Sequence, residues 1–162
     1  MIRTPQPHLP VVAQTHPGRR GKKNEDRYGV FSYLGGPDGS TPVLLAVLAD
    51  GIGGHRAGEV AAEMAVEHIG RYAEESDGIV PERVLEEAIE AASNAIYERA
   101  QSHPAEQGMG STCACAWIAG SRLYTATVGD SRIYLLRGSY VQQISIDHTW
   151  VQEALEQDLI KP

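Results

Sequence analysis

An aspartate at the end of an apolar run is the first candidate for chemistry in this sequence. Asp50 follows the run at residues 43–49 and precedes the glycine-rich stretch Gly51-Ile52-Gly53-Gly54. A dry, unpaired carboxylate is costly, so it requires a cation or hydrogen-bond donors. Glycines let a ligand approach the backbone, and the N-terminus of a following helix attracts anions. The combination predicts a hard metal ion that holds a phosphate, whereas the simpler alternative is an aspartate that caps a turn.

Other acidic residues stand in similar places along the chain. Glu25 and Asp26 precede the strand-like run at residues 27–31, and Asp130 separates the runs at 122–128 and 132–136. These acids strengthen the metal hypothesis if the fold brings them together. The alternatives are a solvated turn for Glu25 and Asp26 and an ordinary hairpin turn for Asp130.

The elements that must position these acids follow from hydrophobic periodicity. Apolar residues at helical spacing predict helices over 56–74 and 81–101, and a last helical piece over 149–157. Residues 1–10 are rich in proline and indicate a loose leader. Strands are expected at residues 11–15, 28–33, 43–49, 112–118, 122–128, 132–136 and 140–144. Strands, then two helices, then a strand meander indicate an α+β fold with antiparallel sheets.

The acidic motifs together resemble one family. The chain is similar to the metal-dependent type 2C (PPM) protein serine/threonine phosphatases in their bacterial form, with the family's motifs in the family's order and spacing. The matching segments are Lys23-Asn24-Glu25-Asp26, Ala49-Asp50-Gly51-Ile52-Gly53-Gly54-His55-Arg56-Ala57-Gly58-Glu59, Gly110-Ser111-Thr112, Val128-Gly129-Asp130-Ser131-Arg132-Ile133-Tyr134 and Ile146-Asp147-His148-Thr149.

The resemblance implies an antiparallel β-sandwich flanked by helix pairs, a four-layer α/β/β/α fold. It covers the N-terminal two thirds or so of that domain. The family has two further metal-binding aspartates C-terminal to the matching region, one in an Asp-Gly pair after a strand and one in a Gly-Asp-Asn motif, and neither of these aspartates lies within residues 1–162. We therefore expect residues 1–162 to be a single truncated domain, with a leader at 1–10 and the start of the family's flap region at 147–162. A natural half-domain is the alternative.

The resemblance also implies a reaction. Members of the family hydrolyse phosphoserine and phosphothreonine esters by direct attack of a hydroxide that bridges two Mg²⁺ or Mn²⁺ ions, and a weaker third ion can bind. By motif position, Asp50 would bridge both ions, the Gly51 carbonyl would complete one shell, and Glu25 would bind the second ion. Asp26 would hold metal-bound waters, and Asp130 would help to bind the third ion. Asp50 and Asp26 are thus the expected catalytic residues. Because hard ions depend on the number of carboxylates, we expect this chain alone to be poorly active.

Two positions depart from the family's pattern. The substrate-phosphate arginine would fall at Gly21, so the neighbouring Arg20 is the expected substitute, because a guanidinium group matches phosphate. The histidine that acts as general acid in the animal enzymes is replaced by Ile52. His55 is the remaining candidate for that role, against a local hydrogen-bonding role. Arg132 is expected to orient Asp130 or to pair in the sheet.

Composition limits the partners. A net charge of −7 argues against nucleic acid, whose binding requires basic surface. The sequence shows no apolar run of about 18 residues and no signal-peptide core, so we expect a cytoplasmic protein with no membrane partner. Cys113 and Cys115 fit small core residues in a reduced cytoplasm, with a metal pair as the alternative. The resemblance implies signal transduction, with phosphorylated substrates of a serine/threonine kinase. No feature of the sequence indicates an oligomeric state.

Three other functions compete with a phosphatase, and the residues argue against the first of them. A dinucleotide-binding loop would require a third glycine at the position of Arg56, and Asp50 would repel a pyrophosphate. A degenerate or half-length phosphatase-like domain could serve as a binding or regulatory module. A relative that acts on phosphorylated anti-sigma antagonists fits the same motifs, because substrate choice lies in loops.

Overall fold

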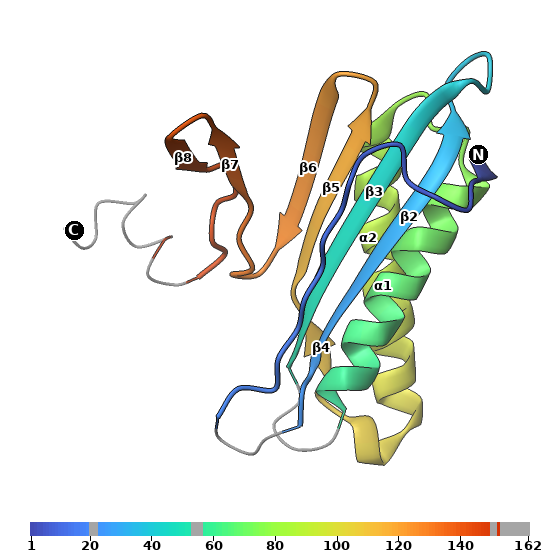
Figure 1. The fold of residues 1–162 in the computed structure, drawn as a ribbon. Coiled ribbons are helices and arrows are strands. Elements are labelled where there is room, and N and C mark those ends of the chain that lie inside the picture. Colours follow the sequence, from blue (N-terminus) through green and yellow to red (C-terminus); the bar gives the residue numbers. More distant parts are fainter. Residues whose placement is uncertain (20–22, 53–56, 150–151, 153–162) are drawn as a thin grey trace.

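One antiparallel sheet carries two helices on one of its faces (Figure 1). The computed structural model describes residues 1–19, 23–52, 57–149 and 152. In these residues six strands form the main sheet, in the order β1-β2-β3-β5-β6 with β4 paired to β3. Their bounds are Ile2–Arg3 (β1), Asp26–Gly35 (β2), Thr41–Ile52 (β3), Gly110–Ser111 (β4), Cys113–Ala119 (β5) and Arg122–Val128 (β6). Every described pairing is antiparallel, as the element order predicted.

The predicted helix pair is confirmed. Helix α1 spans Gly58–Glu75 and α2 spans Pro81–Ser102, followed by the short 3₁₀ helix η1 at Pro104–Glu106. Alternate residues of β3 point to opposite faces, so Val43, Leu45 and Val47 are buried beneath the helices while Leu48 is exposed on the other face. The fully buried Trp117 of β5 lies in the same core. Among the described residues, no helix is long and apolar enough to cross a membrane.

Helix α1 lies very close to β2. A Cβ atom on Gly70 of α1 would come within 2.4 Å of the Phe31 ring, and one on Gly29 within 2.6 Å. The Tyr33 hydroxyl donates a hydrogen bond to the Gly70 carbonyl at 2.8 Å. Glycine at both positions therefore lets the ring sit between strand and helix, and this contact determines where α1 lies along the sheet.

The N-terminal expectations were wrong in two respects. Residues 1–10 are not a loose leader, because Ile2 and Arg3 form β1 and the Thr4 N–H donates to the Ser32 carbonyl at 2.8 Å. Residues 11–15 form no strand. The edge of β2 offers unpaired backbone groups that a short segment can take up, which hydrophobic alternation does not reveal.

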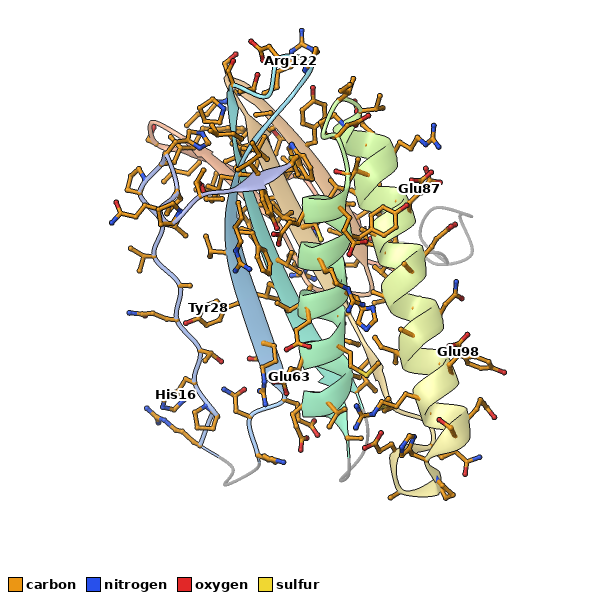
Figure 2. The ribbon with its side chains drawn as sticks, turned by 90° about the vertical axis from the view of Figure 1, so that its right-hand side faces the viewer. His16, Tyr28, Glu63, Glu87, Glu98 and Arg122 are labelled. Atoms are coloured by element: carbon orange, nitrogen blue, oxygen red, sulfur yellow. The ribbon has the colours of Figure 1, made fainter. Side chains whose placement is uncertain are left out.

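Residues 11–15 instead run lengthwise over the sheet face that the helices leave open (Figure 1). Val11 and Val12 line a groove of about 380 Å³ together with Tyr28 and Leu48. Figure 2 shows Tyr28 on the side of the sheet away from the helices, facing the N-terminal segment. The apolar residues of that segment thus pack over the sheet face, and the segment pairs with no strand.

The last two predicted strands form a separate hairpin, β7 at Tyr134–Arg137 and β8 at Tyr140–Gln143. Of the helix expected at 149–157, the structure describes Thr149 and a helical Gln152, and the remainder lies outside the described residues. Cys113 and Cys115 are buried and free, with their Sγ atoms 3.2 Å apart, as expected for core residues.

Candidate functional site

Strand register brings two of the predicted acids together. Asp26 opens β2 and is the direct cross-strand partner of Asp50 near the end of β3. Directly opposed residues on antiparallel strands point to the same side, so the two carboxyl groups are neighbours. They lie on the face of the sheet opposite the helices, where Asp50 is exposed and Asp26 half-buried.

The other two predicted acids also act electrostatically on Asp50. Its pKa is raised, first because burial disfavours the charged form, and then because the Asp26 carboxyl group lies within charge and hydrogen-bond range. Repulsion from Asp130 and Glu25 raises the pKa of Asp50 further. The structure therefore brings together all four predicted carboxylates, which come from three separate parts of the sequence.

The close approach of Gly51 and Gly58 brings the Glu25 carboxylate near the Gly51 carbonyl oxygen. The Gly51 N–H donates to the Glu25 carbonyl at 3.3 Å. A Cβ atom on Gly58 would lie 2.8 Å from the Glu25 carboxyl carbon and 2.9 Å from the Gly51 carbonyl oxygen. A Cβ on Gly51 would lie only 1.9 Å from the Gly58 carbonyl oxygen. A carboxylate and a carbonyl oxygen thus meet over the first residue of α1, in a space that any side chain would fill.

The oxygen donors at this end of the sheet are of the type that Mg²⁺ and Mn²⁺ prefer. They do not form a closed cage: within the part of the chain that the structure describes, no group of three or more His, Cys, Asp or Glu side chains is arranged to hold a metal ion. The residues therefore fit a hard divalent ion by chemistry and by proximity, in an open arrangement.

Basic residues beside the acids already have partners. Lys23 pairs with Glu59 in the first turn of α1, which lowers the pKa of Glu59. The Arg27 guanidinium donates to the Asp26 carbonyl at 2.8 Å and to the Asn24 carbonyl at 3.2 Å. The candidates for the phosphate and proton-donor roles, Arg20 and His55, lie outside the described residues.

Sequence reasoning gave no role to Thr112, which lies between β4 and β5 beside Asp50. Its N–H donates to the Asp50 carbonyl at 2.9 Å, and its Oγ1 accepts from the Asp50 N–H at 3.0 Å. The Ser111 hydroxyl also donates to the Asp50 carbonyl, at 3.2 Å. The available signal was a pair of hydroxyl residues at the start of an apolar strand, but the bonds themselves depend on tertiary placement.

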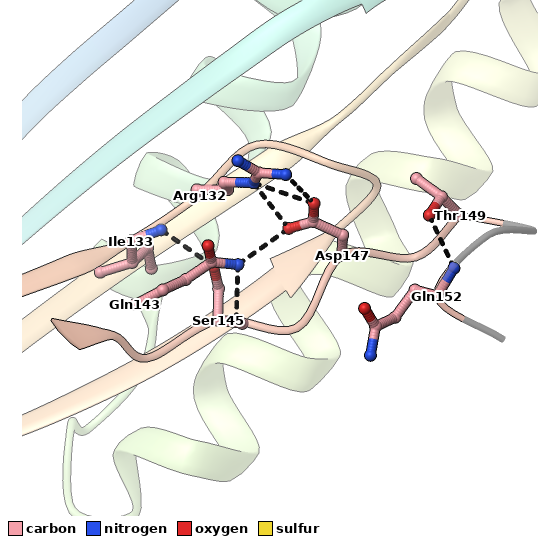
Figure 3. Close-up of polar contacts among 7 residues, drawn as sticks. All are labelled: Arg132, Ile133, Gln143, Ser145, Asp147, Thr149 and Gln152. Carbon is pink, nitrogen blue, oxygen red and sulfur yellow. Dashed lines mark hydrogen bonds and ion pairs between the residues drawn. The ribbon is translucent and has the colours of Figure 1, made fainter. Parts of the chain in front are cut away.

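The turn that carries Asp130 is supported from the segment after β8. Arg132 binds Asp147 with two bonds from Nε, at 3.0 Å to Oδ1 and 2.9 Å to Oδ2 (Figure 3). Arg132 was expected to orient Asp130 or to pair in the sheet, so the observed partner is a correction. The guanidinium lowers the pKa of Asp147, and Gln143 donates to the same carboxylate at 3.0 Å. His148 donates its N–H to the Gly129 carbonyl at 2.9 Å.

Comparisons with known proteins identify the family of this chain. The sequence model of the family described as protein phosphatase 2C matches residues 14–156. The serine/threonine phosphatase stp of Listeria innocua is 36% identical over 146 residues, which cover 88% of this chain and 56% of that protein. The crystal structure of the serine/threonine phosphatase Stp1 from Staphylococcus aureus has a TM-score of 0.77 at 32% identity, covering 92% of this chain and 57% of that one.

A third comparison concerns metal. The catalytic domain of the serine/threonine protein phosphatase PstP, solved in complex with two manganese ions, has a TM-score of 0.66 at 33% identity, over 85% of this chain and 62% of that one. The chain thus spans between 56% and 62% of the length of these three proteins. The match extends through the strands, the helix pair and the acidic end of the sheet, and the chain belongs to the protein phosphatase 2C family.

Proposed function

We propose that this chain provides part of the catalytic centre of a metal-dependent protein serine/threonine phosphatase. One observation carries the proposal: Asp26 is the direct strand partner of Asp50 at the end of β3, beside the place where the Glu25 carboxyl group and the Gly51 carbonyl oxygen meet over Gly58. The names of the matched relatives support a phosphoprotein substrate, with phosphoserine or phosphothreonine as the reacting group.

The acids repel an incoming phosphate unless a cation lies between them. Four carboxylates at one end of a sheet would oppose a phosphate dianion by charge alone, so the site fits a phosphoester only together with divalent ions. When bound, two such ions would supply an activated water and would neutralise charge on the phosphoryl oxygens. Glu25, Asp50 and the Gly51 carbonyl are the residues that would hold them, and Asp26 and Asp130 would orient water or a weaker ion.

Manganese and magnesium both suit oxygen donors, and the PstP complex with two manganese ions supports manganese as the first to test. Arg20 as a phosphate ligand and His55 as a proton donor belong to this proposal through their motif positions. Substrates of a serine/threonine kinase are the proposed physiological partners.

A second candidate function is a phosphatase-like binding module. The open arrangement of the acids in the described part of the chain favours it, because weak metal binding would leave the site without chemistry. The two candidates differ in one measurable property, the release of phosphate in the presence of metal.

The test is hydrolysis of a phosphothreonine peptide with Mn²⁺, followed as phosphate release, with the Listeria innocua relative as positive control. We expect slow hydrolysis by this chain that an excess of chelator abolishes. Asp50→Asn should lower the rate at least about 10²-fold, because it removes a charged ligand at the centre of the site.

Asp38→Asn is the matched control, because Asp38 lies in the exposed turn between β2 and β3 at the opposite end of the sheet. Its rate should equal that of the wild type. Phosphate release that persists in excess chelator would reject the metal-dependent mechanism. Mn²⁺ binding without any release would favour the binding module.

A further inference from the structure

A pair of hydroxyl groups, one buried on Thr112 and one half-buried on Ser131, joins the two acidic segments. Thr112 is only 3% exposed, and its Oγ1 lies 2.7 Å from the Oγ of Ser131. Ser131 directly follows Asp130, and the same Thr112 Oγ1 accepts the N–H of Asp50. A chain of two hydrogen bonds therefore links the backbone of Asp50 to the turn that carries Asp130.

The hydrogen-bonding capacity of the threonine hydroxyl fits this arrangement. A hydroxyl group has one donor hydrogen and two acceptor lone pairs. Accepting from the Asp50 N–H leaves the hydroxyl free to donate to, or accept from, Ser131. The Thr112 N–H returns a bond to the Asp50 carbonyl at 2.9 Å, so both backbone groups of Asp50 are held by one residue.

The methyl group of Thr112 supports the turn as well. Gly129 has φ of +90°, and a Cβ on it would lie 2.8 Å from the Thr112 methyl carbon. The threonine thus touches the turn with its methyl and its hydroxyl while it binds Asp50 with its backbone and its hydroxyl. Neither serine nor valine provides both contacts.

We infer that Thr112 and Ser131 are positioning residues that hold Asp50 and Asp130 at a fixed separation. The physical need is charge: the strand end and the turn each carry a carboxylate, and the hydrogen bonds through Thr112 hold the two segments together, so these like charges repel. A hydrogen-bonded tie opposes that repulsion before any ion is present. The role of these hydrogen bonds in metal binding rests on the proposed function. Their role in holding Asp50 and Asp130 together does not.

The first test measures hydrogen exchange at the Asp50 amide by NMR in the 162-residue chain without metal. Thr112→Val keeps the side-chain volume and removes the acceptor, so exchange at this amide should rise on the order of 10-fold. Thr112→Ser should restore most of the protection. Ser131→Ala should give a smaller rise, because it removes only the second bond.

Ser32→Ala is the matched control. The Ser32 hydroxyl is also buried, at 7% exposure, and lies 2.7 Å from the Thr4 hydroxyl near the other end of β2. Its loss should leave the Asp50 amide unchanged. Unchanged exchange at Asp50 in both Thr112→Val and Ser131→Ala would overturn the inference. If Thr112→Val does not fold, exchange at the Asp50 amide is compared between Ser131→Ala and Ser32→Ala. A rise in Ser131→Ala alone supports the inference, and equal exchange in the two variants overturns it.

The second test measures Mn²⁺ affinity by calorimetry on the folded variants. Ser131→Ala and Thr112→Val should each weaken binding several-fold, and the double variant should lose less than the product of the two, because the bonds form one chain. Fully multiplicative losses would contradict a shared tie. A wild-type chain that binds no Mn²⁺ would reject the proposed function, and the exchange experiment would still judge the tie.

Discussion

Two aspartates at opposite ends of strand β3 experience opposite environments. Asp38 precedes the strand in an exposed turn, and hydrogen bonds from the hydroxyl and backbone of Ser40 lower its pKa. Asp50 lies near the other end, where burial and three neighbouring acids raise its pKa. The fold therefore satisfies the charge at one end and leaves it uncompensated at the other. A cation would relieve the repulsion at the Asp50 end, whereas the Asp38 carboxylate is already stabilised by hydrogen bonds.

The largest effect is expected from a side chain placed in the close contact between Gly51 and Gly58, at the Asp50 end of β3. Gly51→Ala would place a methyl group 1.9 Å from the Gly58 carbonyl oxygen, so α1 or the end of β3 must move. We expect the free energy of unfolding to fall by at least about 3 kcal/mol in urea denaturation. Gly110→Ala is the control, because a Cβ there meets nothing within 4 Å. Equal stability of the two variants would contradict the close approach.

Adding Mn²⁺ should increase the difference between the two ends of β3. Mn²⁺ should raise the melting temperature of the chain, since a ligand that binds only the folded state stabilises it. The affinity should be at least about 10-fold weaker than that of the Listeria innocua relative measured alongside, because fewer carboxylates weaken a hard-ion site. Asp50→Asn should lose the thermal shift, and Asp38→Asn should keep it. Equal affinity of the chain and the relative would show that these residues suffice for tight binding.

The smallest expected effect is on the pH dependence of stability without metal. The folded-state pKa of Asp50 is raised above the ordinary 3.8, so this residue reduces stability as pH rises through that range and ceases to do so at lower pH. At pH 7, Asp50→Asn should therefore raise the free energy of unfolding, but only slightly, because Asp50 is exposed and solvent screens its charge. Below about pH 3.8 the difference should vanish.

Asp38 should show the opposite sign. Its folded-state pKa is lowered, so its contribution to stability is present above the ordinary 3.8 and is lost as pH falls. Asp38→Asn should then be less stable than wild type at pH 7, and the two variants should diverge in urea titrations at that pH. If both substitutions changed the free energy of unfolding in the same direction, the proposed electrostatic difference between the two ends of β3 would be contradicted.

The placement of Asp26 and Asp50 could be predicted from sequence because each lies next to a strand whose hydrophobic pattern is strong. The helix faces were predictable for the same reason, since Ala61, Ala65 and Ile69 follow helical spacing into the core. Residues 11–15 show why pattern alone misleads. A short apolar segment can pack over the face of a sheet as well as pair with a strand, and local sequence does not distinguish these cases.

The supporting contacts were not predictable, because each joins residues distant in sequence through one specific tertiary arrangement. Thr112 meets Ser131 only after β5 and β6 have paired, and Arg132 meets Asp147 only after the β7–β8 hairpin has formed. The motif positions marked these residues without indicating their partners. The role of Gly58 required the approach of α1 to the end of β3, which depends on packing elsewhere.

That packing has a mechanical consequence for the site. The Phe31 ring, wedged between Gly29 and Gly70, prevents α1 from sliding along the sheet. Gly70 lies twelve residues after Gly58 in the same helix, a distance of about 18 Å at the usual rise per residue. A displacement of one residue at the wedge would shift Gly58 by about 1.5 Å, enough to close or open the space shared by Glu25 and Gly51. The size of the space between Glu25, Gly51 and Gly58 thus depends on an aromatic ring that packs twelve residues further along the same helix.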